Sequence, residues 1–370
     1  MTTATATRPL RMGTRASALA RTQSGAFADE LSQLSGRPVE AVIIRTHGDQ
    51  LSSEGKAPPG GDAAGVFVRA LDEALLRNEI DFAVHSLKDV PTVVTSGIVL
   101  AAVPTRADPR DAFVVASRHP GATTVSALPH GARVATSSPR RVSQLLRIRP
   151  DLVMVAMAGN VDTRLQRLEE GRADALILAC AGLDRLGRGG VITRRLEPDE
   201  MLGAPAQGAL GISCREDDEE TREILLKMED PAARAAATAE RELLQFLRGG
   251  CRAPVGARGF LEGEERNLRL KLVGRVLSLD GRECLEDEMS EPHTPPPPSS
   301  TSKKLPSSSF SPSSSSPSEK SPSSSLSPSS LSKNSPFSSS SSFSLGRALA
   351  ERLLARGAAR LIDAARATTP

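Results

Sequence analysis

The stretch RVATSSPRRVSQLL, residues 133–146, contains a short apolar run, a polar turn and the start of a helix. Arg133 to Ala135 suits a β-strand, and Ser138 followed by Pro139 is typical of the first turn of an α-helix. The backbone N–H groups at a helix start, together with the helix dipole, attract anions. The stretch therefore predicts a strand-to-helix turn that binds a negatively charged group.

Arginines occur at this turn and at two others. Arg140 and Arg141 lie in the first helical turn, where positive charge opposes the helix dipole. An external anion explains them better than the alternative, two solvated surface arginines. The same order of strand, polar turn and helix recurs in LRMGTRASALARTQ, with Arg15 and Ser17, and in AGNVDTRLQRL, with Arg164. Because helix starts converge at the ligand cleft of open sheets and arginine suits carboxylates, we expect a small polycarboxylate ligand.

From Leu10 to about Gly211, short apolar runs alternate with longer amphipathic stretches, which indicates an α/β fold. Further strands are expected at Val39–Arg45, Phe82–Val84, Val99–Val103, Ala112–Ala116, Leu152–Val155, Ala175–Ala179 and Ala209–Cys214. Helices are expected at Ala18–Leu34, Val66–Arg77, Arg140–Arg147, Thr163–Glu170 and Thr221–Lys227. The polar segment Thr105–Asp111 suits a crossing between two lobes.

The C-terminal part has a different pattern. A helix-prone run follows Pro231, and strand-like sequence spans Leu268 to Leu279, so we expect a third, α+β domain. Ser299 to Ser344 holds 27 serines in 46 residues and should be disordered, because it has too little apolar surface to offset its ordering entropy. A further amphipathic helix follows this tract, which therefore looks like an insertion. The expected domains are 1–107 with 208–228, then 108–207, and then 229–370, interrupted by a disordered Ser/Pro-rich insertion over 290–344.

Composition excludes several classes of protein. The 370 residues allow two or three domains. A formal charge of +3 and an aromatic content of 2% disfavour nucleic-acid binding. No apolar run is long enough for a membrane span, and MTTATATRPL has no apolar signal-peptide core. We expect a cytoplasmic protein that binds neither nucleic acid nor membranes.

The segment DFAVHSLKDVPT brings Ser86, Lys88 and Asp89 to a turn that ends at Pro91. Two interpretations of Asp89 stay open on the residues alone. It could form a surface ion pair with Lys88, which would contribute little. It could instead be a carboxylate that accepts N–H bonds or stabilises a cationic intermediate.

The four cysteines are too widely spaced for a zinc site built from close pairs, so no metal is expected. Cys180 and Cys214 lie in apolar runs that we expect to be buried strands. Cys284 lies among acidic residues, which should raise the pKa of its thiol. Cys251 follows two glycines and precedes Arg252, so it should be accessible and biased towards thiolate. Lone cysteines are usually incidental, and the residues alone leave the role of Cys251 open.

Ten segments in register resemble the porphobilinogen deaminase, or hydroxymethylbilane synthase, family. They are GTRASALA, THGD, FAVHSLKDVPT, ADPRDAF, ATSSPRR, GNVDTR, ACAGLDRLG, PAQGALGISCR, TAER and LRGGCRAPVG. The resemblance runs from Leu10 to about Asp287 and resumes at Leu345. It implies three domains, the first two folded like type II periplasmic binding proteins around a central cleft. It also implies a monomeric transferase of haem biosynthesis that joins four porphobilinogen molecules head to tail into hydroxymethylbilane and releases ammonia.

The resemblance also assigns site residues. It places a dipyrromethane cofactor on Cys251 through a thioether, makes Asp89 the catalytic residue and implies no metal. The implied cofactor-binding residues are Ser86, Lys88, Thr136, Ser138, Arg140, Arg141 and Arg164. The implied substrate-binding residues are Arg15, Ser17, Gln23, Arg164, Arg185 and Gln207.

Two positions depart from the family pattern. Ala158 stands where many members have an arginine, which removes one expected carboxylate contact, and Ala64 stands where a lysine is often found. The alternative function is a non-catalytic, two-lobed binding protein for a small polycarboxylate. Cys251 beside two glycines and Asp89 among cations favour the enzyme, because binding alone requires neither.

Overall fold

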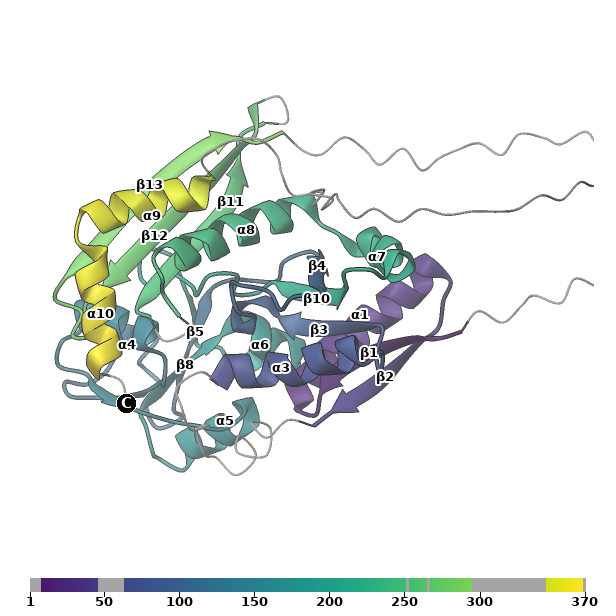
Figure 1. The fold of residues 1–370 in the computed structure, drawn as a ribbon. Coiled ribbons are helices and arrows are strands. Elements are labelled where there is room, and N and C mark those ends of the chain that lie inside the picture. The colour runs from purple at the N-terminus through teal and green to yellow at the C-terminus, as the bar shows by residue number, and fades with distance from the viewer. Residues whose placement is uncertain (1–7, 46–62, 251–252, 265–266, 295–343, 369–370) are drawn as a thin grey trace, which may run out of the picture. The chain divides into compact units, whose positions relative to one another are not determined.

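The computed structural model describes residues 8–45, 63–250, 253–264, 267–294 and 344–368. In these ranges the strands form two five-stranded sheets and one three-stranded sheet, with helices packed against them (Figure 1). The predicted fold class, α/β with a smaller C-terminal α+β part, is confirmed. The domain boundaries given above stay a prediction.

The first sheet has the strand order β2-β1-β3-β10-β4. Strands β1, β2 and β3 are parallel, whereas β10 is antiparallel to both of its neighbours. The strands are β1 (Leu10–Arg15), β2 (Val39–Ile44), β3 (Phe82–Ser86), β4 (Ile98–Ala102) and β10 (Leu210–Arg215). The associated helices are α1 (Ala18–Ser35), α3 (Ala63–Leu76) and α7 (Glu219–Leu225), followed by the 3-10 turn η4 (Leu226–Met228). The core of this sheet packs Phe27 of α1 edge-on against Phe82 of β3, with ring centroids 5.9 Å apart.

The second sheet has the order β7-β6-β8-β5-β9 and repeats the arrangement of the first. Its parallel strands are β6, β7 and β8, and β5 is antiparallel to β8 and β9. The strands are β5 (Asp111–Val115), β6 (Arg133–Ala135), β7 (Val153–Val155), β8 (Ala175–Ala179) and β9 (Arg194–Leu196). The helices are α4 (Pro139–Ile148), α5 (Val161–Glu169) and α6 (Cys180–Arg185), and the 3-10 turns are η2 (Val125–Ala127) and η3 (Gly189–Val191).

The chain passes twice between these two sheets, from β4 to β5 and from β9 to β10. The two crossing segments touch at Ala107, whose N–H donates to Gly208 O at 3.2 Å. Gly208 has a φ of +87°, and a Cβ there would overlap Ala107 O and lie 3.1 Å from Asp108 O. Only glycine fits this close approach of two backbones.

The third sheet is an antiparallel meander of β11 (Val255–Glu262), β12 (Arg269–Leu277) and β13 (Cys284–Pro292). Helices α8 (Pro231–Phe246), α9 (Leu345–Ala355) and α10 (Ala358–Thr368) contact it, and α8 and α9 lie side by side (Figure 1). Leu243, Leu272 and Leu349 are fully buried in the shared core. The helix after the serine-rich tract is therefore part of the C-terminal core, as the sequence predicted.

Local sequence explains where the helices begin. The Ser17 hydroxyl accepts the Ala20 N–H at 3.3 Å at the start of α1, and Asn160 Oδ1 accepts the Thr163 N–H at 2.9 Å at the start of α5. Helix α4 begins with Ser138 as N-cap and Pro139 at its first turn. The Ser17 and Asn160 side chains thus satisfy backbone donors that have no partner within the helix, whereas the Ser138 side chain makes no such cap bond.

Three expectations about secondary structure are wrong. Cys180 is the first residue of α6 and not part of a strand, although it is fully buried as expected. The last amphipathic segment forms two helices, because Gly357 adopts a φ of +98° between them. Strand β13 continues to Pro292, so the insertion cannot begin at residue 290. Residues 295–343 of the predicted disordered tract lie outside the described residues.

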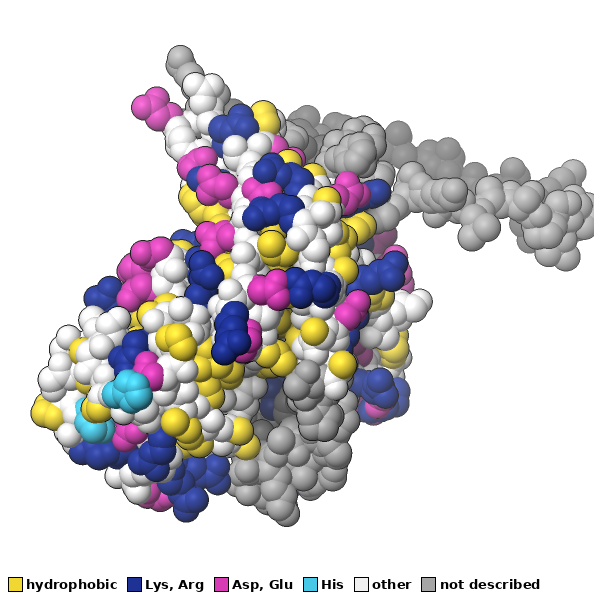
Figure 2. Space-filling view, turned by 90° about the vertical axis from the view of Figure 1, so that its left-hand side faces the viewer, with side chains coloured by type: hydrophobic (Ala, Val, Ile, Leu, Met, Phe, Trp, Pro, Cys, Tyr) yellow, Lys and Arg dark blue, Asp and Glu magenta, His cyan; other side chains and the backbone are white. Residues whose placement is uncertain are grey.

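Figure 2 shows Lys and Arg side chains interspersed with Asp and Glu side chains on the face in view. This distribution matches the near balance of 47 basic and 44 acidic residues. No helix among the described residues is long and apolar enough to cross a membrane.

Candidate active site

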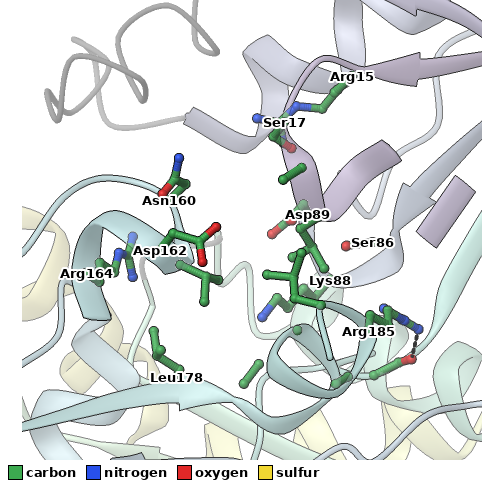
Figure 3. A pocket seen from close by; sticks show the side chains of 18 of the residues that line it. Arg15, Ser17, Ser86, Lys88, Asp89, Asn160, Asp162, Arg164, Leu178 and Arg185 are labelled. Carbon is green, nitrogen blue, oxygen red and sulfur yellow. Dashed lines mark hydrogen bonds between the residues drawn. The ribbon is translucent and has the colours of Figure 1, made fainter. Parts of the chain in front are cut away.

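A cavity of about 260 Å³ is lined by side chains from both five-stranded sheets and their helices. Ser17 and Asp89 lie on one side of it, and Asn160, Asp162 and Arg164 lie on the other (Figure 3). The polar and charged side chains lining it are Arg15, Ser17, Ser86, Lys88, Asp89, Arg141, Asn160, Asp162, Arg164 and Arg185. Residues from all three predicted strand-to-helix turns thus meet at one place, the turn before α4 contributing Arg141.

The turn after β3 brings a cation and an anion to this cavity. Leu87–Asp89 forms the 3-10 turn η1, in which Leu87 is fully buried while Lys88 and Asp89 are half-buried. Lys88 Nζ donates to Gln207 Oε1 at 3.2 Å. Burial lowers the pKa of Lys88 to about 8, and the charge of Asp89 opposes this shift. Lys88 is therefore a cation whose protonation changes around pH 8.

The pair Arg140 and Arg141 is buried around one carboxylate, Asp111. Arg140 Nη1 lies 2.6 Å from Asp111 Oδ2, and Arg141 Nη2 lies 2.7 Å from Asp111 Oδ1. Burial alone would raise the pKa of Asp111, but the two guanidinium groups hold it well below its usual range. The anion that these arginines required is thus supplied by the protein, and Arg141 also reaches the cavity wall.

Arg164 and Arg185 have different surroundings. Arg164 Nε donates to Gly159 O at 2.8 Å, and Arg185 Nη2 donates to Gly208 O at 2.8 Å. Burial, helped by Arg141 and Arg167, lowers the pKa of Arg164 to about 10, and burial also lowers the pKa of Arg185. Within the described residues, both guanidinium groups donate hydrogen bonds to carbonyl or amide oxygens and not to carboxylates. Their positive charge is available to an anionic ligand.

A second cavity of about 80 Å³ shares Arg15, Ser17, Ser86 and Asp89 with the first and is also lined by Gln23. Gln23 Oε1 accepts from Ser86 Oγ at 3.2 Å and from Arg185 Nη1 at 3.4 Å. The Gln23 side chain thus links Ser86, an expected cofactor-binding residue, to Arg185, an expected substrate-binding residue.

His85 also lines the smaller cavity. It is buried, its Nε2 lies 2.9 Å from Ser213 Oγ, and burial with the charge of Arg15 lowers its pKa to about 4. His85 is therefore neutral at physiological pH and adds no charge to the site.

Not every predicted site residue reaches these cavities. Among the described residues, Thr136, Ser138 and Arg140 line neither cavity, and Thr136 and Arg140 are buried. Gln207 acts on the site through its bond to Lys88. Cys251 lies outside the described residues.

Sequence reasoning missed two acidic residues. No local sequence pattern marks Asp111 as a site residue, because its partners Arg140 and Arg141 lie 29 and 30 residues away in the chain. Asp162 lines the cavity but is exposed and lies 3.2 Å from Arg188 Nη2. Its position in the first turn of α5 suggested only a helix start.

The arrangement can bind several carboxylates while it holds one carboxylate, Asp89, near the bound molecule. Lys88 and the guanidinium groups of Arg164 and Arg185, which donate to uncharged oxygens, favour anions, and Asp89 can accept N–H bonds or exchange a proton. Cation-rich walls of this kind fit a dipyrromethane group, because each of its pyrrole rings carries acidic side chains.

Two family models cover most of the chain. Residues 10–223 match the dipyrromethane cofactor-binding domain of porphobilinogen deaminase, and residues 234–305 match the C-terminal domain of porphobilinogen deaminase. The predicted family and cofactor are thus confirmed.

Curated relatives agree with these matches. Porphobilinogen deaminase 1 of Streptomyces coelicolor is 48% identical over 277 residues, covering 74% of this chain and 85% of the relative. The porphobilinogen deaminase of Roseiflexus castenholzii is 47% identical over 274 residues, covering 74% of this chain and 87% of the relative.

Solved structures with a detectable likeness include a periplasmic arginine-binding protein of Salmonella typhimurium. It is 14% identical, covers 65% of this chain and 94% of its own, and has a TM-score of 0.33, which is too low to carry an argument. The family models and curated relatives carry the assignment: the chain belongs to the porphobilinogen deaminase family, the transferases of tetrapyrrole biosynthesis that use a dipyrromethane cofactor.

Proposed function

We propose that this chain joins four porphobilinogen molecules head to tail into hydroxymethylbilane, with release of one ammonia at each joining step. The observation that carries the proposal is the placement of Asp89 and Lys88 in a cavity that also contains Arg15, Arg164 and Arg185. Porphobilinogen carries two carboxylates, so each added ring brings two more negative charges for the cations of the site to balance. We further propose that the enzyme is a cytoplasmic monomer.

Cys251 is the proposed attachment point of the cofactor, through a thioether. When bound, the dipyrromethane supplies the terminal pyrrole carbon to which the first substrate is joined. Its carboxylates are bound by Ser86, Lys88, Arg141 and Arg164. Arg140 holds Asp111, and thereby Arg141, in position. Thr136 and Ser138 contribute through the turn that begins α4.

Asp89 is the proposed catalytic residue. Its carboxylate accepts pyrrole N–H bonds and stabilises the positive charge that develops when the aminomethyl group of the substrate loses ammonia. It can also take up the proton that leaves when the new carbon–carbon bond forms. Arg15, Ser17, Gln23, Arg185 and Gln207 orient the incoming substrate.

The test of this proposal is hydroxymethylbilane formation from porphobilinogen by the purified protein. The wild-type protein should exceed its sequence mass by one dipyrrole unit. The Cys251→Ala variant should have the plain sequence mass and no activity, and an active Cys251→Ala protein would refute the assignment. Asp89→Asn should keep the fold and lose roughly 10²- to 10⁴-fold in turnover.

The alternative of a non-catalytic binding protein for a polycarboxylate makes a different prediction. Such a protein would bind porphobilinogen without consuming it and would have no added mass. Membership of the porphobilinogen deaminase family favours the enzyme.

A further inference from the structure

The turn that carries Lys88 and Asp89 ends with backbone carbonyls that need donors. Leu87–Asp89 is a single 3-10 turn, closed by the Val90 N–H, which donates to Leu87 O at 3.2 Å. Pro91 has no N–H and stops the helical path, so the last carbonyls of the turn cannot be satisfied by a continuing helix. Some other group must fix their positions.

Arg241 of α8 donates three hydrogen bonds to backbone carbonyls of this segment. Its Nη1 donates to Val90 O at 2.7 Å and to Leu87 O at 3.3 Å, and its Nη2 donates to Pro91 O at 2.7 Å. The guanidinium group is planar and its N–H bonds point in fixed directions. One rigid side chain therefore holds the carbonyls on both sides of Asp89.

The same face of α8 packs against the turn. Ala233 and Ala237 are buried in one apolar cluster with Leu87, and Val90 packs against it. Ala237 precedes Arg241 by four residues, so the two side chains lie on one face of the helix. The turn is thus held by apolar contact at Leu87 and by hydrogen bonds at Val90 and Pro91.

We propose that Arg241 is a positioning residue for Asp89. It fixes, through the backbone of the turn, where the Asp89 carboxylate meets the substrate, although it is not among the residues lining the cavity of the candidate active site. This inference rests on the proposed function of Asp89. A displacement of about 1 Å at a reacting group can cost on the order of 10²-fold in rate.

Arg234 offers a matched control on the same helix. It donates from Nη1 to Leu100 O and from Nη2 to Ala101 O, both at 3.1 Å, and also pairs with Glu229. These bonds connect α8 to strand β4 and not to the turn of Asp89. Arg234→Ala therefore removes a similar set of bonds without touching the proposed catalytic turn.

The experiment compares Arg241→Ala, Arg241→Lys and Arg234→Ala after intact mass has shown that each protein carries its cofactor. We expect Arg241→Ala to lower kcat roughly 10- to 100-fold with KM changed less than about threefold. Arg234→Ala should lower stability and keep kcat within about twofold of the wild type. In an Asp89→Asn background, Arg241→Ala should cause no further loss, because the side chain acts through Asp89.

Three results would overturn the inference: wild-type kcat in Arg241→Ala, an equal loss of kcat in Arg234→Ala, or losses at Arg241 and Asp89 that multiply. If Arg241→Ala does not fold, Arg241→Lys decides. Lysine keeps the positive charge but lacks the planar guanidinium group. Arg241→Lys should therefore still lower kcat, and a wild-type kcat in this variant would contradict the proposal. A wild-type protein that forms no hydroxymethylbilane would instead refute the proposed function itself.

Discussion

Asp111 determines which of the arginines near the cavity pair with a carboxylate of the protein. It is fully buried and occupies the guanidinium groups of Arg140 and Arg141, whereas Arg164 and Arg185 donate to uncharged oxygens. Of these four arginines, Arg140 therefore serves the framework alone, and Arg164 and Arg185 keep their charge for a ligand. Arg141 does both, because it pairs with Asp111 and also forms part of the cavity wall.

Replacing Asp111 by Asn should destabilise the fold strongly. The substitution leaves two buried guanidinium groups without their counter-charge, which typically costs roughly 3–5 kcal/mol. Urea unfolding measures this loss. Asp280→Asn, at an exposed ion pair with Arg282, is the control and should change stability by less than about 1 kcal/mol. Similar values for the two variants would contradict the assigned role.

Lys88 should make ligand binding depend on pH. Its pKa is lowered to about 8, so the protonated fraction falls as the pH rises through that value. Because a carboxylate binds the protonated amine, porphobilinogen affinity of the cofactor-free Cys251→Ala protein should fall above pH 8, by up to roughly tenfold per unit. Calorimetric titration at several pH values measures this.

Lys88→Arg is the control for this pH dependence. Arginine keeps its charge to higher pH, so the alkaline fall attributable to position 88 should disappear. An identical profile in the two proteins would show that another group is responsible.

At the scale of elements, local signals predicted most of the architecture. Strands β6 and β8 begin and end where the sequence indicated, and α1, α4 and α5 start at the polar turns that were recognised. These features depend on residues close in sequence. The break at Gly357 was missed because a glycine within an amphipathic pattern does not by itself reveal a left-handed backbone.

Gly208→Ala should disturb the junction of the two crossing segments. The residue has a positive φ, and an added Cβ would overlap the Ala107 carbonyl oxygen. Gly187→Ala is the matched control, because Gly187 also has a positive φ, of +67°, but has open space around it. The control should cost about 1–2 kcal/mol from backbone strain alone, and Gly208→Ala clearly more. Equal losses on urea unfolding would show that the close approach is unimportant.

At the scale of the whole molecule, the sequence predicted which residue types gather but not how they pair. Eight of the thirteen described residues assigned to the site line the larger cavity, namely Arg15, Ser17, Ser86, Lys88, Asp89, Arg141, Arg164 and Arg185. The pairing of Asp111 and the support of the Asp89 turn by Arg241 depend on contacts between distant segments. No periodicity or capping rule carries that information.

The central claim is that the chain builds a tetrapyrrole on a covalently held primer. The most direct measurement is the intact mass of the protein after rapid mixing with one to four equivalents of porphobilinogen. The account predicts a protein that already carries a dipyrrole and gains successive pyrrole units, which are lost again as hydroxymethylbilane appears. A protein that binds porphobilinogen but never gains mass, and releases no product, would contradict it.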